Sequence, residues 1–144
     1  MQKYLKKATY NDCDLLFNWA NDKTVRESSF NNNKIEYEEH INWFQNKLNS
    51  NDTDIFIFYY QHIPVGKVSI DIENKEAIIS YSIDKDYRGL RLSTDMLKLL
   101  EKNVERPISK FVGYVKYDNV QSQLVFERLG YQKVKCDNYI KYYK

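Results

Sequence analysis

The sequence predicts an α/β fold in which four helices flank a mixed sheet of about seven strands. Two kinds of hydrophobic spacing support this prediction: apolar residues recur every three or four positions in four segments, and they alternate or run together in seven shorter ones. The segments follow the order strand, helix, helix, three strands, helix, strand, helix and two strands, which is typical of an α/β sandwich. With 144 residues, 42% of them apolar, the chain is long enough to form one such core.

The composition indicates a single domain, residues 1–144, and excludes several partners. No Gly/Ser-rich or Pro-rich linker, repeat or composition break divides the chain. The 22 Lys and Arg against 20 Asp and Glu give a formal net charge of +2, which is too small for a nucleic-acid or anionic-membrane partner. Cys13 and Cys136 have no partner at metal-ligand spacing, so we expect reduced thiols and no metal. The sequence has no signal-peptide pattern and no membrane-spanning apolar run, so we expect a cytoplasmic protein.

The first third of the chain predicts one strand and two helices. A short strand at residues 4–8 leads into a helix at residues 9–20, which begins with Thr9 and an acidic residue three positions later, as in a capping box. The polar residues 23–34 predict an irregular loop. Apolar residues at steps of four, three and four predict a second, amphipathic helix at residues 36–48.

The middle of the chain predicts three successive antiparallel strands. Residues 55–60 are β-branched and aromatic throughout, which favours a strand buried on both faces. Residues 68–72 and 79–83 alternate apolar with polar side chains, and short polar turns precede each of them.

The last third predicts two helices and three strands. One helix begins near Leu92, and another covers residues 122–129 and ends at Gly130, a residue that readily adopts the left-handed conformation closing a helix. The strands are residues 111–115, 131–135 and 139–143.

The unit of strand, short loop and helix at residues 79–103 has the pattern of a phosphate site. A helix amino terminus offers unpaired amides and a partial positive charge, and a loop before it adds further amides. Gly89 lets the backbone approach a pyrophosphate closely, while Arg88 and Arg91 add positive charge. An ordinary turn with surface arginines is the alternative.

Two segments together resemble the GNAT superfamily of acyl-CoA-dependent N-acetyltransferases over essentially the whole chain. In that family Arg/Gln-x-x-Gly-x-Gly/Ala opens the pyrophosphate-binding helix; here Arg88 matches the first position, and Arg91 and Ser93 occupy the two small positions. A later family signature, Asn followed by a helix reading roughly Leu-Tyr-Glu-x-Leu-Gly-Phe, resembles Asn119 and residues 125–131. The resemblance implies a GNAT-like mixed, mostly antiparallel sheet. It also implies an enzyme that moves an acetyl group from acetyl-CoA to a primary amine, by direct attack through a tetrahedral intermediate.

The amino-terminal part resembles GNATs that act on nucleotide-linked amino sugars, including those of the pseudaminic acid pathway. The residues that carry this second resemblance are 19–22, 25–26, 29–31 and 39–44. It implies a small-molecule amine acceptor and is compatible with a monomer or a homodimer. Related openings occur in GNATs that modify proteins, so a protein amino terminus or a lysine is the alternative acceptor.

The same resemblance implies how acetyl-CoA (CoA) is held. The splayed end of the strand at residues 79–83 pairs with the pantetheine arm, the amides of residues 88–93 hold the pyrophosphate, and Asn119 contacts the pantetheine, unless it is a helix cap alone. The expected CoA-binding residues are Ile83, Arg88, Gly89, Leu90, Arg91, Leu92, Ser93, Asn119 and Phe126.

Two residues depart from the family pattern. Arg91 replaces a glycine; if its backbone is right-handed, its side chain points outward and still contacts phosphate. Phe126 replaces the tyrosine that donates a proton to the departing thiolate, so we expect water or another tyrosine, Tyr117 or Tyr131, to replace it. If the thiolate has no such donor, Phe126→Tyr is expected to raise turnover. These departures also leave open a non-catalytic acyl-CoA-binding domain.

Four residues of the amino-terminal part are expected on the acceptor side. His40 is the predicted base because the pKa of a free histidine, about 6.5, suits proton removal near neutral pH; a structural histidine is the alternative. We expect it on the helix face opposite Tyr37. Arg26 and Ser29 are predicted to contact a phosphate or a sugar hydroxyl, unless they belong to a solvated loop, and Trp43 is either a core residue or a stacking platform for the acceptor.

Overall fold

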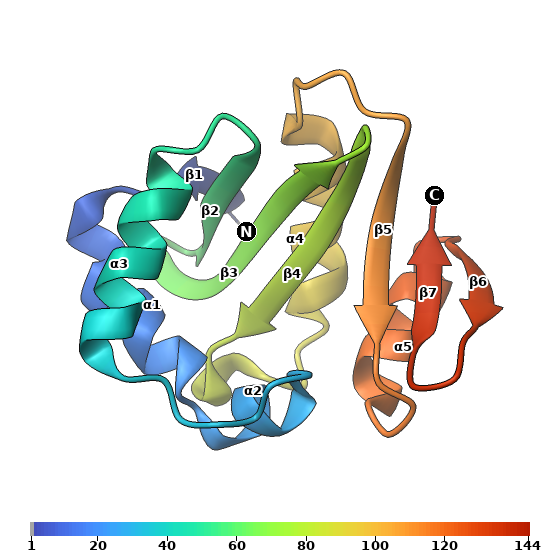
Figure 1. The fold of residues 1–144 in the computed structure, drawn as a ribbon, viewed down its shortest axis with the longest axis horizontal. Helices are drawn as coiled ribbons and strands as arrows, with labels where there is room; N and C mark the ends of the chain where they lie inside the picture. Colours follow the sequence, from blue (N-terminus) through green and yellow to red (C-terminus); the bar gives the residue numbers. More distant parts are fainter. Residues whose placement is uncertain (1) are drawn as a thin grey trace.

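The computed structural model describes residues 2–144, which form one seven-stranded sheet with helices on both faces (Figure 1). The strands are β1 (Lys3–Lys7), β2 (Thr53–Tyr60), β3 (Ile63–Glu73), β4 (Glu76–Ile83), β5 (Lys110–Val115), β6 (Gln132–Lys135) and β7 (Ile140–Tyr143), in the sheet order β1-β2-β3-β4-β5-β7-β6. The helices are α1 (Cys13–Ala20), α2 (Lys23–Ser28), α3 (Tyr37–Leu48), α4 (Leu92–Asn103) and α5 (Val120–Arg128), with short 3-10 turns at Tyr10–Asp12 and Lys85–Tyr87. Neighbouring strands are antiparallel except β4 and β5, which confirms the predicted mixed, mostly antiparallel sheet.

One helix lies where the sequence predicted a loop, so residues 2–144 contain five α-helices rather than four. This helix, α2, begins where the Asp22 carboxylate accepts a hydrogen bond from the Val25 amide at 3.2 Å. Arg26 then ties it to α1, because its Nε donates to the Ala20 carbonyl at 2.6 Å. A search for hydrophobic periodicity misses α2 because no residue of this helix is buried.

Two hydrophobic clusters hold the layers together, and β2 contributes to both. Phe56 and Phe58 pack on the α4 side of the sheet, while Ile55 and Ile57 pack under α1 and α3. None of these four side chains is more than 5% exposed, which confirms that this strand is buried on both faces.

Helix α3 presents a different face to the sheet than the sequence predicted. The structure buries His40 together with Phe44, whereas Tyr37 is 44% exposed. The imidazole is accommodated because it stacks on the Phe44 ring and its Nε2 lies 3.0 Å from the Cys13 carbonyl oxygen. His40 is therefore on the core-facing side of α3 and not opposite it.

Strands β4 and β5 pair over only three residues and then separate (Figure 1). Pairing ends at Ile78 opposite Val112. Beyond this point β4 stays paired with β3 as far as Ile83, while β5 pairs with β7 as far as Val115. The splayed end expected for residues 79–83 is confirmed, and their backbone is unpaired on the β5 side.

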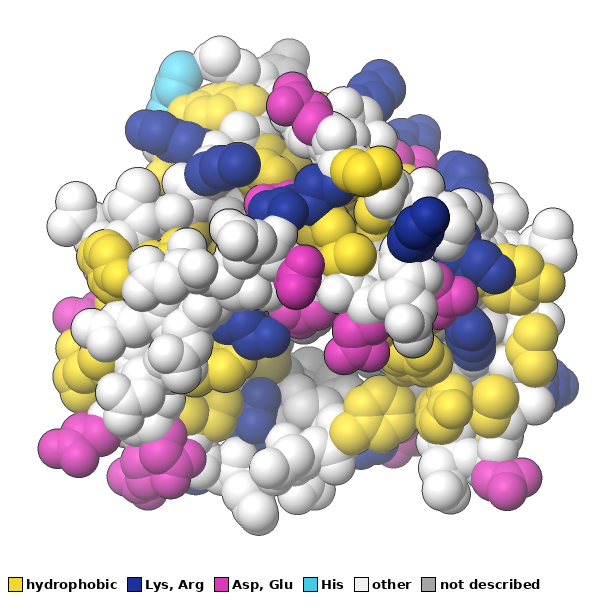
Figure 2. Space-filling model, turned by 45° about the horizontal axis from the view of Figure 1, so that its top comes forward, with side chains coloured by type: hydrophobic (Ala, Val, Ile, Leu, Met, Phe, Trp, Pro, Cys, Tyr) yellow, Lys and Arg dark blue, Asp and Glu magenta, His cyan; other side chains and the backbone are white. Residues whose placement is uncertain are grey.

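The surface carries both signs of charge. Figure 2 shows basic and acidic side chains interspersed on one face. Elsewhere in the structure opposite charges form ion pairs, such as Lys3 with Asp95 at 2.7 Å. Over residues 2–144, every helix is too short or too polar to cross a bilayer.

Candidate functional site

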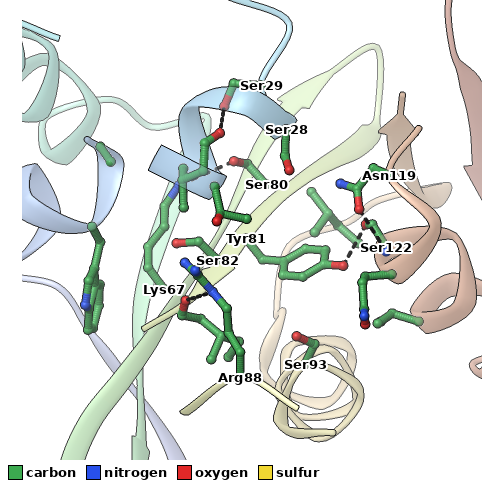
Figure 3. Close-up of a pocket in the computed structure, with 18 of the residues that line it drawn as sticks. Ser28, Ser29, Lys67, Ser80, Tyr81, Ser82, Arg88, Ser93, Asn119 and Ser122 are labelled. Atoms are coloured by element: carbon green, nitrogen blue, oxygen red, sulfur yellow. Dashed lines mark hydrogen bonds between the residues drawn. The ribbon is translucent and has the colours of Figure 1, made fainter. Parts of the chain in front are cut away.

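The separation of β4 from β5 opens a cleft of about 1170 Å³ that extends from the start of α4 to the α1–α3 layer. The cleft exceeds the volume of typical single-ligand pockets, roughly 300–1,000 Å³. Figure 3 shows that polar side chains from α2, β4, α4 and the start of α5 line it: Ser28, Ser80, Ser82, Ser93, Asn119 and Ser122. A cleft with this extent and lining has space for two reactants.

The loop before α4 presents free amides to the cleft. Gly89 and Arg91 have φ angles of 81° and 60°, and Leu92 begins α4. Within the described chain, no backbone amide of residues 89–93 donates a hydrogen bond to a protein acceptor. Because such amides at a helix start also carry a partial positive charge, the loop has the geometry that a diphosphate requires.

Arg91 is left-handed, so the condition under which its side chain was expected to point outward is not met. The left-handed conformation costs an L-residue roughly 1–2 kcal/mol, which is why glycine is favoured in such a turn. The Arg91 side chain still lines the cleft.

We expect Arg91→Gly to raise the free energy of unfolding by about 0.5–1 kcal/mol, because relief of the left-handed strain exceeds the entropy that glycine adds to the unfolded chain. Arg91→Ala keeps the strain and is expected not to be stabilised. Both substitutions remove the guanidinium, so calorimetry should show the same change in CoA affinity for both. Urea denaturation checks the stability difference, and equal stability of the two variants would contradict the strain.

Arg88 is positioned by protein contacts rather than left free for phosphate. Its Nη2 pairs with the Asp22 carboxylate at 2.9 Å, and its Nε donates to the Ile83 carbonyl at 3.1 Å. Burial raises the pKa of Asp22, but hydrogen bonds from Arg88 and the Val25 amide outweigh this and lower it overall. Arg88 thus anchors the phosphate loop to α2 through its side chain, and a contact between its backbone amide and phosphate stays a prediction.

A buried hydroxyl in the cleft supports the fit of this region to CoA. Thr94 Oγ1, in the first turn of α4, is buried and has no hydrogen-bond partner among residues 2–144. Buried polar groups are nearly always hydrogen-bonded, so an unpaired one indicates a ligand or water partner. Together with the amides of residues 89–93, Thr94 supplies the donors that a phosphorylated, amide-rich molecule such as CoA requires.

Asn119 caps α5, and its Oδ1 accepts the Ser122 amide at 3.2 Å, which confirms the predicted cap. The Ser122 hydroxyl lies 2.6 Å from the hydroxyl of Tyr81, joining α5 to β4 across the cleft (Figure 3). Burial raises the pKa of Tyr81 to about 12, although the Ser122 hydrogen bond opposes the shift, so the phenol stays protonated at neutral pH. Sequence reasoning missed this hydroxyl pair, since 41 residues separate its members.

Phe126 is a core residue that closes the floor of the cleft. Only 2% of it is exposed, and its ring packs on those of Tyr131 and Tyr142. Its para carbon faces Gly113 of β5, where an added Cβ would lie 2.3 Å away. A hydroxyl at this position has no space, so the structure argues against the predicted gain from Phe126→Tyr.

The two tyrosines proposed to replace the missing acid point elsewhere, which corrects that expectation. The Tyr117 hydroxyl donates to the Cys136 carbonyl in the β6–β7 hairpin, and Tyr117 does not line the cleft. The Tyr131 hydroxyl donates to Glu101 at 2.8 Å on the α4 side. Neither phenol reaches the parted strands, whereas Tyr81 does.

His40 lines the inner wall of the cleft but is only 2% exposed. Because the Cys13 carbonyl can only accept, Nε2 carries the proton and Nδ1 is left as the basic nitrogen. Burial lowers the pKa of His40, although the Cys13 carbonyl and Asp14 oppose the shift. His40 is thus a neutral histidine with a structural hydrogen bond, and its role as a base stays a prediction.

The other predicted acceptor residues also line the cleft, but they differ in how far protein contacts occupy them. The Arg26 guanidinium is occupied by the carbonyls of Ala20, Asn31 and Asn33 and by the Ser29 hydroxyl. Arg26 and Ser29 thus hold the loop after α2, and their substrate contacts stay predictions. Trp43 is 41% exposed, which supports a stacking platform over a core residue.

Lys67 of β3 is a cleft residue that sequence reasoning missed. It is half-buried, and its Nζ lies 3.4 Å from the Ser80 hydroxyl (Figure 3). Burial lowers the pKa of Lys67 to about 8; Asp71 opposes this shift and Lys47 adds to it. In the sequence Lys67 alternates with buried residues like any solvent-facing lysine, so no local signal distinguishes it.

The comparisons with known proteins agree with this geometry. The family model described as an acetyltransferase (GNAT) domain matches residues 4–132. No curated protein sequence matches the chain. Among solved structures, RimL, a ribosomal L7/L12 alpha-N-protein acetyltransferase in complex with coenzyme A, is 20% identical with a TM-score of 0.86, covering 100% of this chain and 94% of that one.

Two further solved structures share the fold. Spermidine N-acetyltransferase from Vibrio cholerae, in complex with CoA and spermine, is 14% identical with a TM-score of 0.83, covering 99% of this chain and 95% of that one. Aminoglycoside acetyltransferase AAC(6')-Ib, in complex with coenzyme A, is 14% identical with a TM-score of 0.84, covering 99% and 94%. These likenesses extend over whole chains. With the family match over most of its length, the chain belongs to the GNAT family and is an N-acetyltransferase whose co-substrate is acetyl-CoA.

Proposed function

We propose that this enzyme acetylates the amine of a nucleotide-linked amino sugar, acting in the cytoplasm as a monomer or homodimer. The observation that carries the proposal is the separation of β4 and β5 after Ile78, beside the open amides of residues 89–93. This arrangement leaves one face of the cleft to an extended thioester and the other, toward α2 and α3, to an acceptor.

The chain's own groups orient the acyl donor. The free backbone of residues 79–83 pairs with the pantetheine amides as an added strand does, and the loop before α4 holds the diphosphate. Bound acetyl-CoA supplies an activated thioester. Holding the thioester and the amine in one cleft replaces a collision in solution, which is a large part of the rate gain in transfer reactions.

The Tyr81–Ser122 pair is the proposed donor to the leaving sulfur. Both hydroxyls are protonated at neutral pH, and the pair lies where β4 faces α5. A hydrogen bond from this pair stabilises negative charge that develops on sulfur when the carbon–sulfur bond breaks. The proton lost by the amine balances the proton gained by the thiol, so the pair is left unchanged after each turnover.

Proton removal from the amine is assigned to His40 through Nδ1, directly or through water. Its Nε2–H is held by the Cys13 carbonyl, so the ring orientation is fixed. The lowered pKa keeps His40 neutral and ready to accept a proton near pH 7.

A sugar acceptor is supported by the chemistry of the cleft wall. The exposed Trp43 ring offers an apolar face, and Ser28, Ser80 and Ser82 offer hydroxyls. An aromatic face beside hydrogen-bonding groups suits a ring that carries both C–H faces and hydroxyls.

Two measurements test the proposed function. Calorimetry is expected to show acetyl-CoA binding, and a thiol-release assay is expected to show faster turnover with nucleotide-linked amino sugars than with spermidine or a peptide amino terminus. Faster turnover with a peptide would favour the protein-acetyltransferase alternative. Binding without thiol release for any amine would favour a non-catalytic acyl-CoA-binding domain.

A further inference from the structure

We propose that Lys67, Ser80 and Ser82 form a subsite for an oxyanion, carboxylate or phosphoryl, carried by the amine acceptor. We call these three residues the lysine–serine subsite. The inference rests on the proposed function and adds the charge class of acceptor that the enzyme selects.

The sheet register brings the three side chains together. Lys67 of β3 lies opposite Ser82 of β4, and Ser80 is two residues before Ser82, so all three project from the same face of the sheet. That face is the one covered by α1 and α3 over β2, where Ile57 pairs with Lys67. Over β4 it borders the cleft, and Figure 3 shows the Lys67 chain running along the cleft wall toward Ser80.

The polar groups of the subsite are available to a ligand. Among residues 2–144, the one hydrogen bond of Lys67 Nζ is the long contact to Ser80, and no carboxylate lies within 4.0 Å of it. Asp71, four residues along β3, is occupied by Lys47 and Thr53, each at 2.7 Å. A half-buried ammonium without a counterion is costly, and an oxyanion from the acceptor supplies that counterion.

The charge of the cleft wall also favours an anionic acceptor. Glu39 is the one carboxylate among the described residues that line the cleft, whereas its cationic side chains are Arg26, Lys67, Arg88, Arg91 and Arg128. Arg26 and Arg88 are occupied by protein acceptors, so among the described residues on the acceptor side Lys67 is the cation left without a carboxylate or carbonyl partner. A polycationic acceptor meets repulsion here, and an anionic one is attracted.

The protonation state of Lys67 supports anion binding at neutral pH. Because its pKa is lowered only to about 8, the side chain is mostly an ammonium at pH 7. The charged or titratable groups that face it are Asp71 on its own strand and Lys47 and His40 on α3. Preference for an anionic acceptor is therefore expected to fall as the pH rises through about 8.

Matched acceptor pairs provide the test, measured as kcat/KM by thiol release. The phosphoryl arm compares glucosamine 6-phosphate with glucosamine, and the carboxylate arm compares 4-aminobutanoate with 4-aminobutanamide. The wild-type enzyme is expected to prefer the anionic member of at least one pair by about 10- to 100-fold, the effect of one charge-assisted hydrogen bond. The arm with the preference identifies the oxyanion.

Variants locate the preference. Lys67→Met is expected to abolish the preference, because KM rises for the anionic acceptor and stays the same for the neutral one. Lys67→Arg is expected to retain much of the preference. Lys67→Glu is expected to shift selectivity toward spermidine. Lys98→Met removes a lysine from the exposed side of α4 and is the matched control, expected to behave as wild type. CoA affinity measured by calorimetry should be the same for all variants, which shows that each is folded.

Two outcomes would overturn the inference: equal kcat/KM within both pairs for the wild-type enzyme, or a Lys67→Met variant that lowers kcat for neutral and anionic acceptors alike, as loss of a base would.

If no amine of any charge is acetylated, the proposed function fails instead. The subsite is then decided by calorimetry of glucosamine 6-phosphate with CoA-loaded protein, where wild type should bind at least about tenfold more tightly than Lys67→Met. Equal affinity of the two proteins would rule out the subsite.

Discussion

Removal of both hydroxyls at the parted strands, in the double variant Tyr81→Phe/Ser122→Ala, is expected to lower kcat about 10²- to 10³-fold. The pair is 2.6 Å apart and is the proposed donor to the leaving sulfur. Each single variant leaves one hydroxyl behind, and either atom of the pair can be the donor. The single losses are therefore expected to be smaller, roughly tenfold each, because the remaining hydroxyl substitutes in part.

The controls separate chemistry from folding. Tyr143→Phe removes a hydroxyl that bonds Gln132 on the far side of the sheet and should leave kcat unchanged. CoA affinity and the unfolding midpoint should be similar in the single variants, since a Phe ring fills the space of Tyr81. A double variant with wild-type kcat would show that the leaving sulfur needs no donor from this pair.

Gly113→Ala is expected to lower the free energy of unfolding by roughly 2–3 kcal/mol, a typical cost of overpacking. The new Cβ would lie 2.3 Å from the para carbon of Phe126 and within 2.9 Å of two further ring atoms. Phe126 has nowhere to move because it stacks on Tyr142 and packs against Tyr131. Urea denaturation measures the loss.

Two more variants test this packing. Phe126→Tyr places a hydroxyl against β5 at the same point and is expected to destabilise by about 1–3 kcal/mol without raising kcat. Phe126→Leu shortens the side chain, so Gly113→Ala should cost much less in that background, and the double-mutant cycle gives the coupling between the two sites. A rise in turnover for Phe126→Tyr would contradict this position of the ring. It would support the expectation that a tyrosine at position 126 donates a proton to the leaving thiolate.

Patterns that depend on neighbouring residues were predicted well. The capping box at Thr9, the cap at Asn119 and the alternation in β3 and β4 all appear in the structure, because each results from contacts within a few residues. Helix α2 was missed because its stabilising contacts are polar, and the face of α3 was misassigned because a histidine occupies a core position.

Among the residues of the site, too, those defined by neighbouring residues were predicted, and those defined by long-range contacts were missed. The phosphate loop is recognisable because all its donors come from one short segment before α4. Tyr117 was wrongly favoured because it is near Asn119 in sequence, yet its hydroxyl is bonded to the β6–β7 hairpin. Tyr81 lies far from α5 in sequence, and only the register of β4 turns its hydroxyl toward Ser122.

The sequence by itself determined the order of the strands and of every α-helix but α2, the caps at Thr9 and Asn119, the loop before α4 and the family, because these depend on local spacing and on motifs of a few residues. Tertiary structure alone decided which hydroxyls meet across the parted strands, that Phe126 is a core residue, and that Lys67 lies beside Ser80 with no carboxylate of residues 2–144 in ion-pair distance. The physical reason is that burial and long-range pairing set the charge and freedom of a side chain, and both arise only when distant segments pack together.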